Sequence, residues 1–165
     1  EPPLGLIALQ TYLNRKFGSE IRGKIVKSRV DFDSYKDLNN IISEFDPDLI
    51  GVSAMTFHKD FFHKSIKKIR DQGYNKPIVV GGPHPTTSYE EVLKDDNIDL
   101  CVLGEGEVTL SDIVNLLMKG KEINFEELSK IPGIAFNSEK YPNINISNNK
   151  KTIGLDTKNP QLSVR

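Results

Sequence analysis

Several features that would support common protein functions are scarce or missing in this sequence. Cys101 is the only cysteine among 165 residues, so no internal disulfide can form, and a reducing, cytoplasmic location is expected. No apolar run reaches the roughly 18 residues that a membrane-spanning helix needs. The 22 basic and 23 acidic residues leave a net charge of −1, which gives no electrostatic case for binding nucleic acid or an anionic membrane.

Motifs of nucleotide and metal chemistry are also missing. The Gly-x-Gly-x-x-Gly fingerprint is only half present, because Thr109 stands where a third glycine would follow Gly104 and Gly106. No Gly-Lys-Ser/Thr sequence exists, which excludes a nucleotide-hydrolysing phosphate loop. His58 and His63 have a spacing that does not place two metal ligands on one helix face.

The sequence instead alternates short apolar runs with amphipathic stretches. This pattern predicts a flavodoxin-like (Rossmann-like) α/β fold, with a parallel sheet and helices on both faces. We expect the strand over 48–55 to be buried and the strand over 24–32 to be partly exposed. Cys101 should pack as a small buried hydrophobic residue. The expected helices cover 4–17, 34–46, 60–71, 88–94 and 109–118, and the expected strands cover 24–32 and 48–55 and run through Ile78 and Leu100.

The character of the sequence changes after Gly120. Residues 132–136 predict a short strand, and 151–155 offer a hairpin partner for it. Between them, 143–149 is polar and rich in asparagine. We therefore divide the chain into an α/β domain over 1–120 and a weakly packed hairpin and linker over 121–165.

Two glycine-rich corners end two of the predicted strands, and a third strand ends in small polar residues. In an open α/β sheet, ligands bind at the carboxyl ends of the strands, and glycine there permits positive φ and close approach of a ligand. Ser53 and Thr56 could donate a hydrogen bond to an amide or phosphate. The candidate binding residues are Ser53, Met55, Thr56, Gly81, Gly82, Pro83, His84, Pro85, Thr86, Gly104, Glu105, Gly106 and Glu107.

Each candidate also has a purely structural interpretation. The corner over 81–85 could be only a rigid turn, in which His84 caps an end, and a methionine such as Met55 is more typical of a core. Glu105 and Glu107 could be no more than favourable charges at a helix N-terminus. Because no base, nucleophile or metal set converges with these two carboxylates, we expect no catalytic residue in this chain.

Four segments occur in an order that resembles one family. They are Pro2-Pro3-Leu4-Gly5-Leu6, Asp48-Leu49-Ile50-Gly51-Val52-Ser53, Val80-Gly81-Gly82-Pro83-His84-Pro85-Thr86 and Gly104-Glu105-Gly106-Glu107. Together they resemble the amino-terminal cobalamin-binding domain of cobalamin-dependent radical S-adenosylmethionine enzymes, with the anaerobic magnesium-protoporphyrin IX monomethyl ester cyclases nearest. The Ile131-Pro132-Gly133-Ile134 stretch resembles the hairpin that follows this domain, so the likeness spans roughly 2–137.

The resemblance implies cobalamin as the ligand, lying over 53–56, 81–86 and 104–107. It also implies that the iron–sulfur cluster and S-adenosylmethionine belong to a catalytic domain outside this chain, since one cysteine cannot supply a three-cysteine cluster motif. None of the three histidines lies in an Asp-x-His-x-x-Gly motif, so no histidine of that motif is expected to ligate cobalt. The chain would not be catalytic by itself.

Other functions stay open. A cofactor-free interaction or scaffold module would keep the same fold, and a flavin-binding flavodoxin-like domain is also compatible with it. A response-regulator domain would need a phosphorylatable aspartate at a strand end, and 53–56 offers none.

The resemblance also predicts a strand that these 165 residues lack. Proteins of this kind open with a hydrophobic strand just before the Pro2-Pro3-Leu4 segment, and it lies between the second and third strands. Because this chain begins at Glu1 rather than Met, we expect that strand to have been left out upstream. Two alternatives stay open: the neighbouring strands could close together, which would need the first helix to repack, or a homodimer could form through exposed sheet edges. In either case the cofactor pocket should be incomplete.

Overall fold

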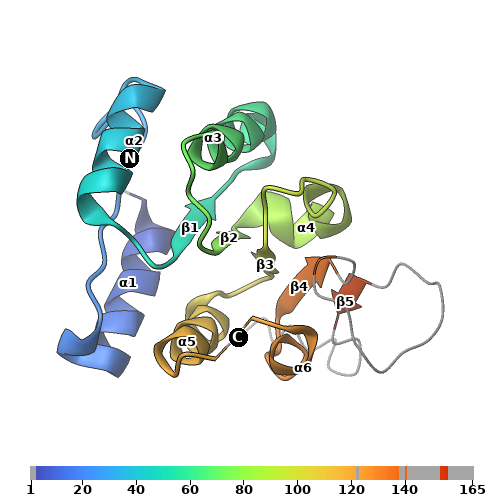
Figure 1. Cartoon of the computed structure of the whole chain (residues 1–165). Helices are drawn as coiled ribbons and strands as arrows, with labels where there is room; N and C mark the ends of the chain where they lie inside the picture. The colour runs from blue at the N-terminus through green and yellow to red at the C-terminus, as the bar shows by residue number, and fades with distance from the viewer. Residues whose placement is uncertain (1–2, 122, 138–139, 141–152, 156–165) are drawn as a thin grey trace.

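A computed structural model describes residues 3–121, 123–137, 140 and 153–155, and Figure 1 shows its helices and strands. Among these residues, no helix is long and apolar enough to cross a membrane. The elements in chain order are α1 (Leu4–Phe17), the 3₁₀ turn η1 (Gly18–Glu20), α2 (Tyr35–Phe45), β1 (Ile50–Ser53), the 3₁₀ turn η2 (Thr56–His58), α3 (Lys59–Asp71), β2 (Ile78–Gly81), α4 (Pro83–Val92), β3 (Leu100–Val102), α5 (Glu107–Met118), α6 (Phe125–Leu128), β4 (Ile134–Asn137) and β5 (Ile153–Leu155).

The strands form one sheet in the order β1-β2-β3-β4-β5. The first three strands are parallel, whereas β4 and β5 join antiparallel. One apolar core lies between the sheet and α2, α3 and α4, and a second lies between the sheet and α5 and α6 (Figure 1). The predicted α/β fold with helices on both faces is therefore confirmed.

The two inner parallel strands are built from apolar residues because both of their faces are covered. Ile78 and Val80 of β2 and Leu100 of β3 are fully buried. The predicted burial of Cys101 is confirmed as well, since its side chain is inaccessible in the middle of β3. Burial raises the pKa of the Cys101 thiol to about 12.

We expect Cys101 to be unreactive in the native protein. A free thiol has a pKa of about 8.5, so the pKa raised to about 12 leaves roughly three thousandfold less thiolate near neutral pH, and access is blocked in addition. A thiol reagent such as Ellman's reagent should therefore label no cysteine in buffer and one in guanidinium chloride. Rapid labelling of the folded protein would contradict the position of Cys101 in the core.

Three predicted helices match the structure closely. α1 ends at Phe17, and the next residue, Gly18, has a φ of 57° that stops the helix. α2 begins with a capping box, in which Ser34 accepts from the Asp37 amide and Asp37 accepts from the Ser34 amide. α3 buries Phe62, Ile66 and Ile69, the face that its periodicity predicted, and Ser65 is buried with them.

The strand predicted over 24–32 is wrong. This stretch has one isolated bridge, between Ser28 and Phe32, and no ladder. It ends in a local turn in which the Val30 and Asp31 amides donate to the Lys27 carbonyl, and Arg29 has a φ of 62°. A strand needs a neighbour for its backbone groups, and no strand of the described chain lies beside this stretch.

The expectation that 48–55 contains a strand is confirmed by β1, but the expectation that this strand is buried is wrong. β1 lies at the edge of the sheet, and its burial alternates, with Gly51 and Ser53 exposed. Only Ile50 and Val52 pack toward the core shared with α2 and α3. The sequence is apolar enough for an inner strand, but the described sheet leaves one side of β1 without a partner.

The expected weak packing after Gly120 needs a correction over its first part. Leu128, Ala135 and Phe136 are buried in the same two cores as the α/β domain. The Leu103 amide donates to the Gly133 carbonyl, which ties the turn before β4 to the end of β3. The predicted hairpin is confirmed in its backbone pairing, because β4 and β5 are antiparallel partners. The asparagine-rich 143–149 lies outside the described residues.

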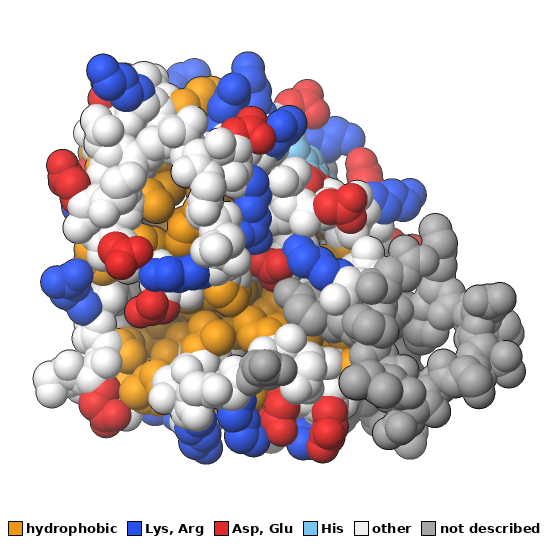
Figure 2. Space-filling model, viewed as in Figure 1, with side chains coloured by type: hydrophobic (Ala, Val, Ile, Leu, Met, Phe, Trp, Pro, Cys, Tyr) orange, Lys and Arg blue, Asp and Glu red, His pale blue; other side chains and the backbone are white. Residues whose placement is uncertain are grey.

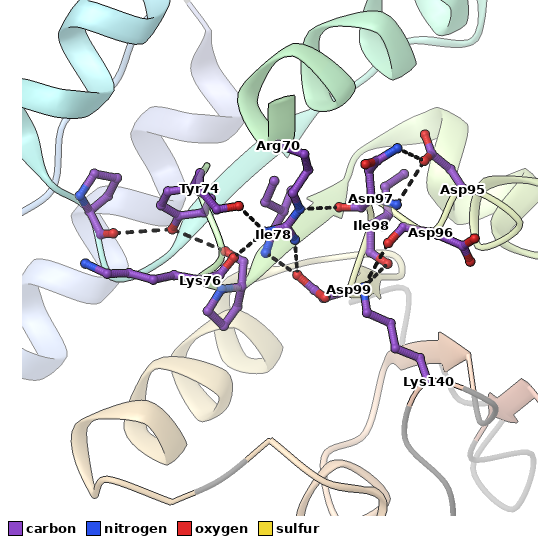
Figure 3. Close-up of polar contacts among 12 residues, drawn as sticks. Arg70, Tyr74, Lys76, Ile78, Asp95, Asp96, Asn97, Ile98, Asp99 and Lys140 are labelled. Carbon is purple, nitrogen blue, oxygen red and sulfur yellow. Dashed lines mark hydrogen bonds and ion pairs between the residues drawn. The ribbon is translucent and has the colours of Figure 1, made fainter. Parts of the chain in front are cut away.

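A polar network joins the amino ends of β2 and β3 (Figure 3). Asp99 accepts from the Ile78 amide at 2.7 Å, and Arg70 and Lys140 both reach its carboxylate. The Arg70 guanidinium also donates to the carbonyls of Tyr74, Lys76 and Asn97. Burial raises the pKa of the Tyr74 hydroxyl nearby. Every charge in this network has a partner, and it lies at the end of the sheet opposite the glycine-rich corners.

Candidate functional site

The carboxyl ends of β1, β2 and β3 meet at one edge of the sheet. Ser53 is the register partner of Gly81, and Val80 is the partner of Cys101. The Ala54 amide donates to the Gly81 carbonyl at 3.1 Å, and the His84 amide donates to the Ala54 carbonyl at 3.2 Å. The strand ends at 53–56 and 81–86 are therefore in direct contact.

The third predicted segment, 104–107, is linked to these two through one side chain. The Thr86 hydroxyl oxygen accepts from the Gly104 amide at 3.1 Å, across eighteen positions of sequence. Thus the three predicted segments, 53–56, 81–86 and 104–107, form one continuous surface at the carboxyl edge of the sheet. This is the place where open α/β sheets bind ligands.

The corner after β2 is the first turn of α4. The helix predicted over 88–94 begins earlier, at Pro83, with a kink at Ser88. Pro83 and Pro85 fit there because the first turn of a helix needs no amide hydrogens from them, and proline fixes a helical φ. The sequence-based prediction placed the start too late because it took both prolines as part of a loop.

The fold itself requires glycine at position 82, independently of any ligand. Its φ is 95°, and a Cβ atom built on it would lie 2.9 Å from the Ser53 hydroxyl and 3.1 Å from the Ala54 carbonyl oxygen. The absence of a side chain at Gly82 therefore allows the ends of β1 and β2 to pack together, and it does not serve to make room for a ligand. A substitution at Gly82 would disturb the fold and the site together.

The candidate residues differ in how open they are. Ser53, Met55, Thr56, Pro83, Gly104 and Glu105 are exposed, and Gly81, Gly82, Thr86, Gly106 and Glu107 are half-buried. His84 and Pro85 are buried. These last two lie beneath the surface, so they can support the corner but present no atom to a ligand on it.

His84 is an unusual buried polar residue. Its side chain is 1% exposed, and neither ring nitrogen has a hydrogen-bond partner among the described residues. Its ring packs edge-on against Phe62 and His63 of α3. His63 itself pairs with Asp95, at 2.6 Å between Nδ1 and the carboxylate. The described part of the chain holds no group of three or more histidine, cysteine or acidic residues that could bind a metal ion.

Hydrogen-bond donors at this edge come from the N-terminus of α5. No side chain caps this helix, and the described residues provide no acceptor for the amides of Glu107, Val108 and Thr109. The N-terminus of α4 differs, because its two prolines have no amide hydrogen and the His84 amide is already bonded. A ligand's carbonyl or phosphate oxygens would therefore find backbone donors on the α5 side of the surface.

The sequence-based prediction missed an apolar rim around the surface. Phe57 in η2 is 76% exposed, and Phe61, Val108 and Leu4 are exposed in the first turns of α3, α5 and α1. Met55, Phe57 and Phe61 follow the end of β1, Val108 follows the end of β3, and Leu4 begins α1. The sequence pattern could not identify these residues as exposed, because an apolar residue in the first turn of a helix looks the same in the sequence as a core residue. Exposed apolar groups gathered at one edge are typical of a binding surface.

Comparisons with known sequences identify the family of this chain. The chain matches the B12 binding domain family over residues 1–114. It is 34% identical over 123 residues to an uncharacterized methyltransferase of Pyrococcus horikoshii, which covers 74% of this chain and 26% of that protein. It is 33% identical over 93 residues to the anaerobic magnesium-protoporphyrin IX monomethyl ester cyclase of Synechocystis, which covers 56% of this chain and 18% of that protein.

Solved structures show the same fold. The radical S-adenosylmethionine methyltransferase TsrM of Kitasatospora setae, with cobalamin and a [4Fe-4S] cluster bound, superposes with a TM-score of 0.72 at 22% identity, over 84% of this chain and 27% of that one. This chain thus spans about a quarter or less of the length of these relatives. By its match over residues 1–114, the chain belongs to the B12-binding domain family, and it resembles the domains found in cobalamin-dependent radical S-adenosylmethionine enzymes.

Proposed function

We propose that this chain binds cobalamin at the carboxyl edge of its sheet, over 53–56, 81–86 and 104–107. The observation that carries the proposal is the direct contact of these three segments, through the Gly81, Ala54 and Thr86 hydrogen bonds, in a chain of the B12-binding family. They make one surface from three strand ends, and a ligand as large as a corrinoid needs such a surface.

The groups at this surface suit the chemistry of a corrinoid. Its amide side chains and its phosphate offer oxygens to the open amides of Glu107 and Val108, and to the hydroxyls of Ser53 and Thr56. Its apolar ring edges would lie against Met55 and the apolar rim. A bound corrinoid would supply a redox-active cobalt centre. The described residues would bind it, orient it and keep water from its apolar parts.

We further propose that catalysis belongs to another part of the polypeptide. The chain has one cysteine, and Cys101 is buried, so these residues cannot hold an iron–sulfur cluster. The relatives are about four or more times longer than the segment they share with this chain. A radical S-adenosylmethionine catalytic domain, with its cluster and S-adenosylmethionine, is the partner that this resemblance supports.

The test is corrinoid retention by the polypeptide that carries this domain. After incubation with hydroxocobalamin and desalting, the ultraviolet–visible spectrum should show about one corrinoid per chain. A parallel incubation with flavin mononucleotide should leave no flavin bound. A folded protein that retains no corrinoid would contradict the proposal and favour a cofactor-free interaction module.

Cobalt ligation gives a second, independent prediction. Because His84 is buried against α3, it should not coordinate the metal, so His84→Leu should retain corrinoid with an unchanged spectrum. Stability should stay within about 1 kcal/mol of the parent or rise, since replacing a buried group without hydrogen bonds by an apolar one costs little. His63→Leu, which breaks the pair with Asp95, serves as the matched control. A spectral change that marks the loss of a nitrogen ligand in His84→Leu would disprove this assignment.

A further inference from the structure

We propose that Thr109 and the turn over 131–133 hold the loop over 104–108 in the shape that binds a corrinoid. The inference rests on the function proposed above, because this loop carries the third segment of the binding surface. Thr109 would be a positioning residue: it is only 6% exposed, and its hydroxyl points to the turn. The turn belongs to the segment that leads out of the α/β domain, so that segment would control the affinity of the site.

The loop is fixed at both of its ends by hydrogen bonds to one distant turn. Just before the loop, the Leu103 amide donates to the Gly133 carbonyl at 2.9 Å. Just after it, the Thr109 hydroxyl donates to the Pro132 carbonyl at 3.0 Å, across 23 positions of sequence. Two successive carbonyls of the turn therefore hold the two residues that flank the loop.

Apolar packing alone would not orient this loop. Figure 2 shows hydrophobic side chains between the positions that α5 and the sheet occupy in Figure 1, and the core on this face includes Ile113 and Leu116 of α5. Such packing is non-directional, so it holds the helix on the sheet without aiming the amides at its N-terminus. Hydrogen bonds are directional, and those at Leu103 and Thr109 can fix the orientation.

The turn is well anchored for this role. Ile131 and Ile134, on either side of Pro132 and Gly133, are 7% and 3% exposed and lie in the same core as α5. Gly133 has a φ of 74°, and a Cβ atom built on it would lie 2.8 Å from the Thr109 hydroxyl oxygen. Glycine therefore permits the close contact between the turn and the first turn of α5.

The contact bears on binding because the loop holds the backbone donors of the proposed site. The amides of Glu107 and Val108 have no acceptor among the described residues, and they directly precede Thr109. Pro132 is exposed, so its carbonyl can turn to water if the hydroxyl is removed. The loop would then lose its support at one end while the core under α5 stays packed. A corrinoid would have to order the loop on binding, which lowers its affinity.

Thr109→Val tests this contact, because valine has nearly the same shape as threonine and no hydroxyl. Without corrinoid, the Leu103 and Gly104 amides of the variant should exchange hydrogen about 10-fold faster, and the Ala54 amide should be unchanged. The Kd for hydroxocobalamin should rise about 10-fold, the effect of one lost hydrogen bond, with about one corrinoid per chain still bound at saturation. Thr109→Ser keeps the hydroxyl and should restore both values.

Ser65→Ala is the matched control for a general loss of stability. Ser65 is 8% exposed and its hydroxyl also donates to a backbone carbonyl, that of Phe61, but it lies in α3. It should lower the urea midpoint about as much as Thr109→Val does, yet leave the Kd and the exchange of the loop unchanged. An equal rise of the Kd in Ser65→Ala would overturn the positioning role.

The parent protein separates this inference from the function on which it rests. A parent that binds no corrinoid would contradict both. If the parent binds corrinoid and Thr109→Val binds it equally well, or exchanges Leu103 and Gly104 at the parent's rate, only the positioning role is overturned.

Discussion

Replacing Asp99 by alanine should lower the free energy of unfolding by about 3–5 kcal/mol, the usual cost of removing one partner from a buried charged pair. The loss is large because the Asp99 carboxylate, almost wholly buried, is the partner of Arg70, of Lys140 and of the Ile78 amide. Without it, the Arg70 guanidinium keeps only carbonyl acceptors in a half-buried position. Urea unfolding followed by circular dichroism measures the difference.

Asp96 provides the matched control. It lies in the same turn but is exposed, and Asp96→Ala should change stability by no more than about 0.5 kcal/mol. Asp99→Asn should fall between the two variants, because it keeps an acceptor for the Ile78 amide and loses the charge. If Asp99→Ala unfolds at the same urea concentration as the parent, the network does not stabilise the sheet.

The sequence was most informative where local pattern and tertiary environment agree. The burial of Ile78, Val80 and Cys101 followed from short β-branched runs that stop at glycine, because such runs suit an inner parallel strand. The periodicity of Phe62, Ile66 and Ile69 likewise identified the buried face of α3. The meeting of three strand ends could be predicted because parallel strands place their carboxyl ends at one edge.

Features that depend on distant partners could not be predicted in this way. Residues 24–30 have a strand pattern, but a ladder needs a neighbour, and the pattern contains no information on whether one is present. Asp99 stood in an apolar run without any sign of Arg70, twenty-nine positions earlier. The burial of His84 was also hidden, since it results from Phe62 and His63 of α3 covering the ring.

A bulky side chain placed on the proposed corrinoid surface should strongly weaken retention of the ligand. We expect Thr56→Trp to weaken hydroxocobalamin binding by about 100-fold or more, equivalent to about 2.7 kcal/mol. Thr56 is exposed at the first position of η2, and its side chain forms no hydrogen bond with the described residues, so tryptophan can be accommodated without breaking the fold. The indole would occupy the space over the end of β1 where the corrinoid is expected to lie.

Gln72→Trp is the control for this substitution, because Gln72 is also exposed but follows α3, at the opposite end of the sheet. It should bind corrinoid like the parent, and both variants should show the parent's circular dichroism and urea midpoint. The comparison separates the position of the site from its existence. Retention by the parent and by Thr56→Trp alike would mean that the corrinoid lies elsewhere, whereas loss in Gln72→Trp alone would place it at the amino end, beside the Asp99 network.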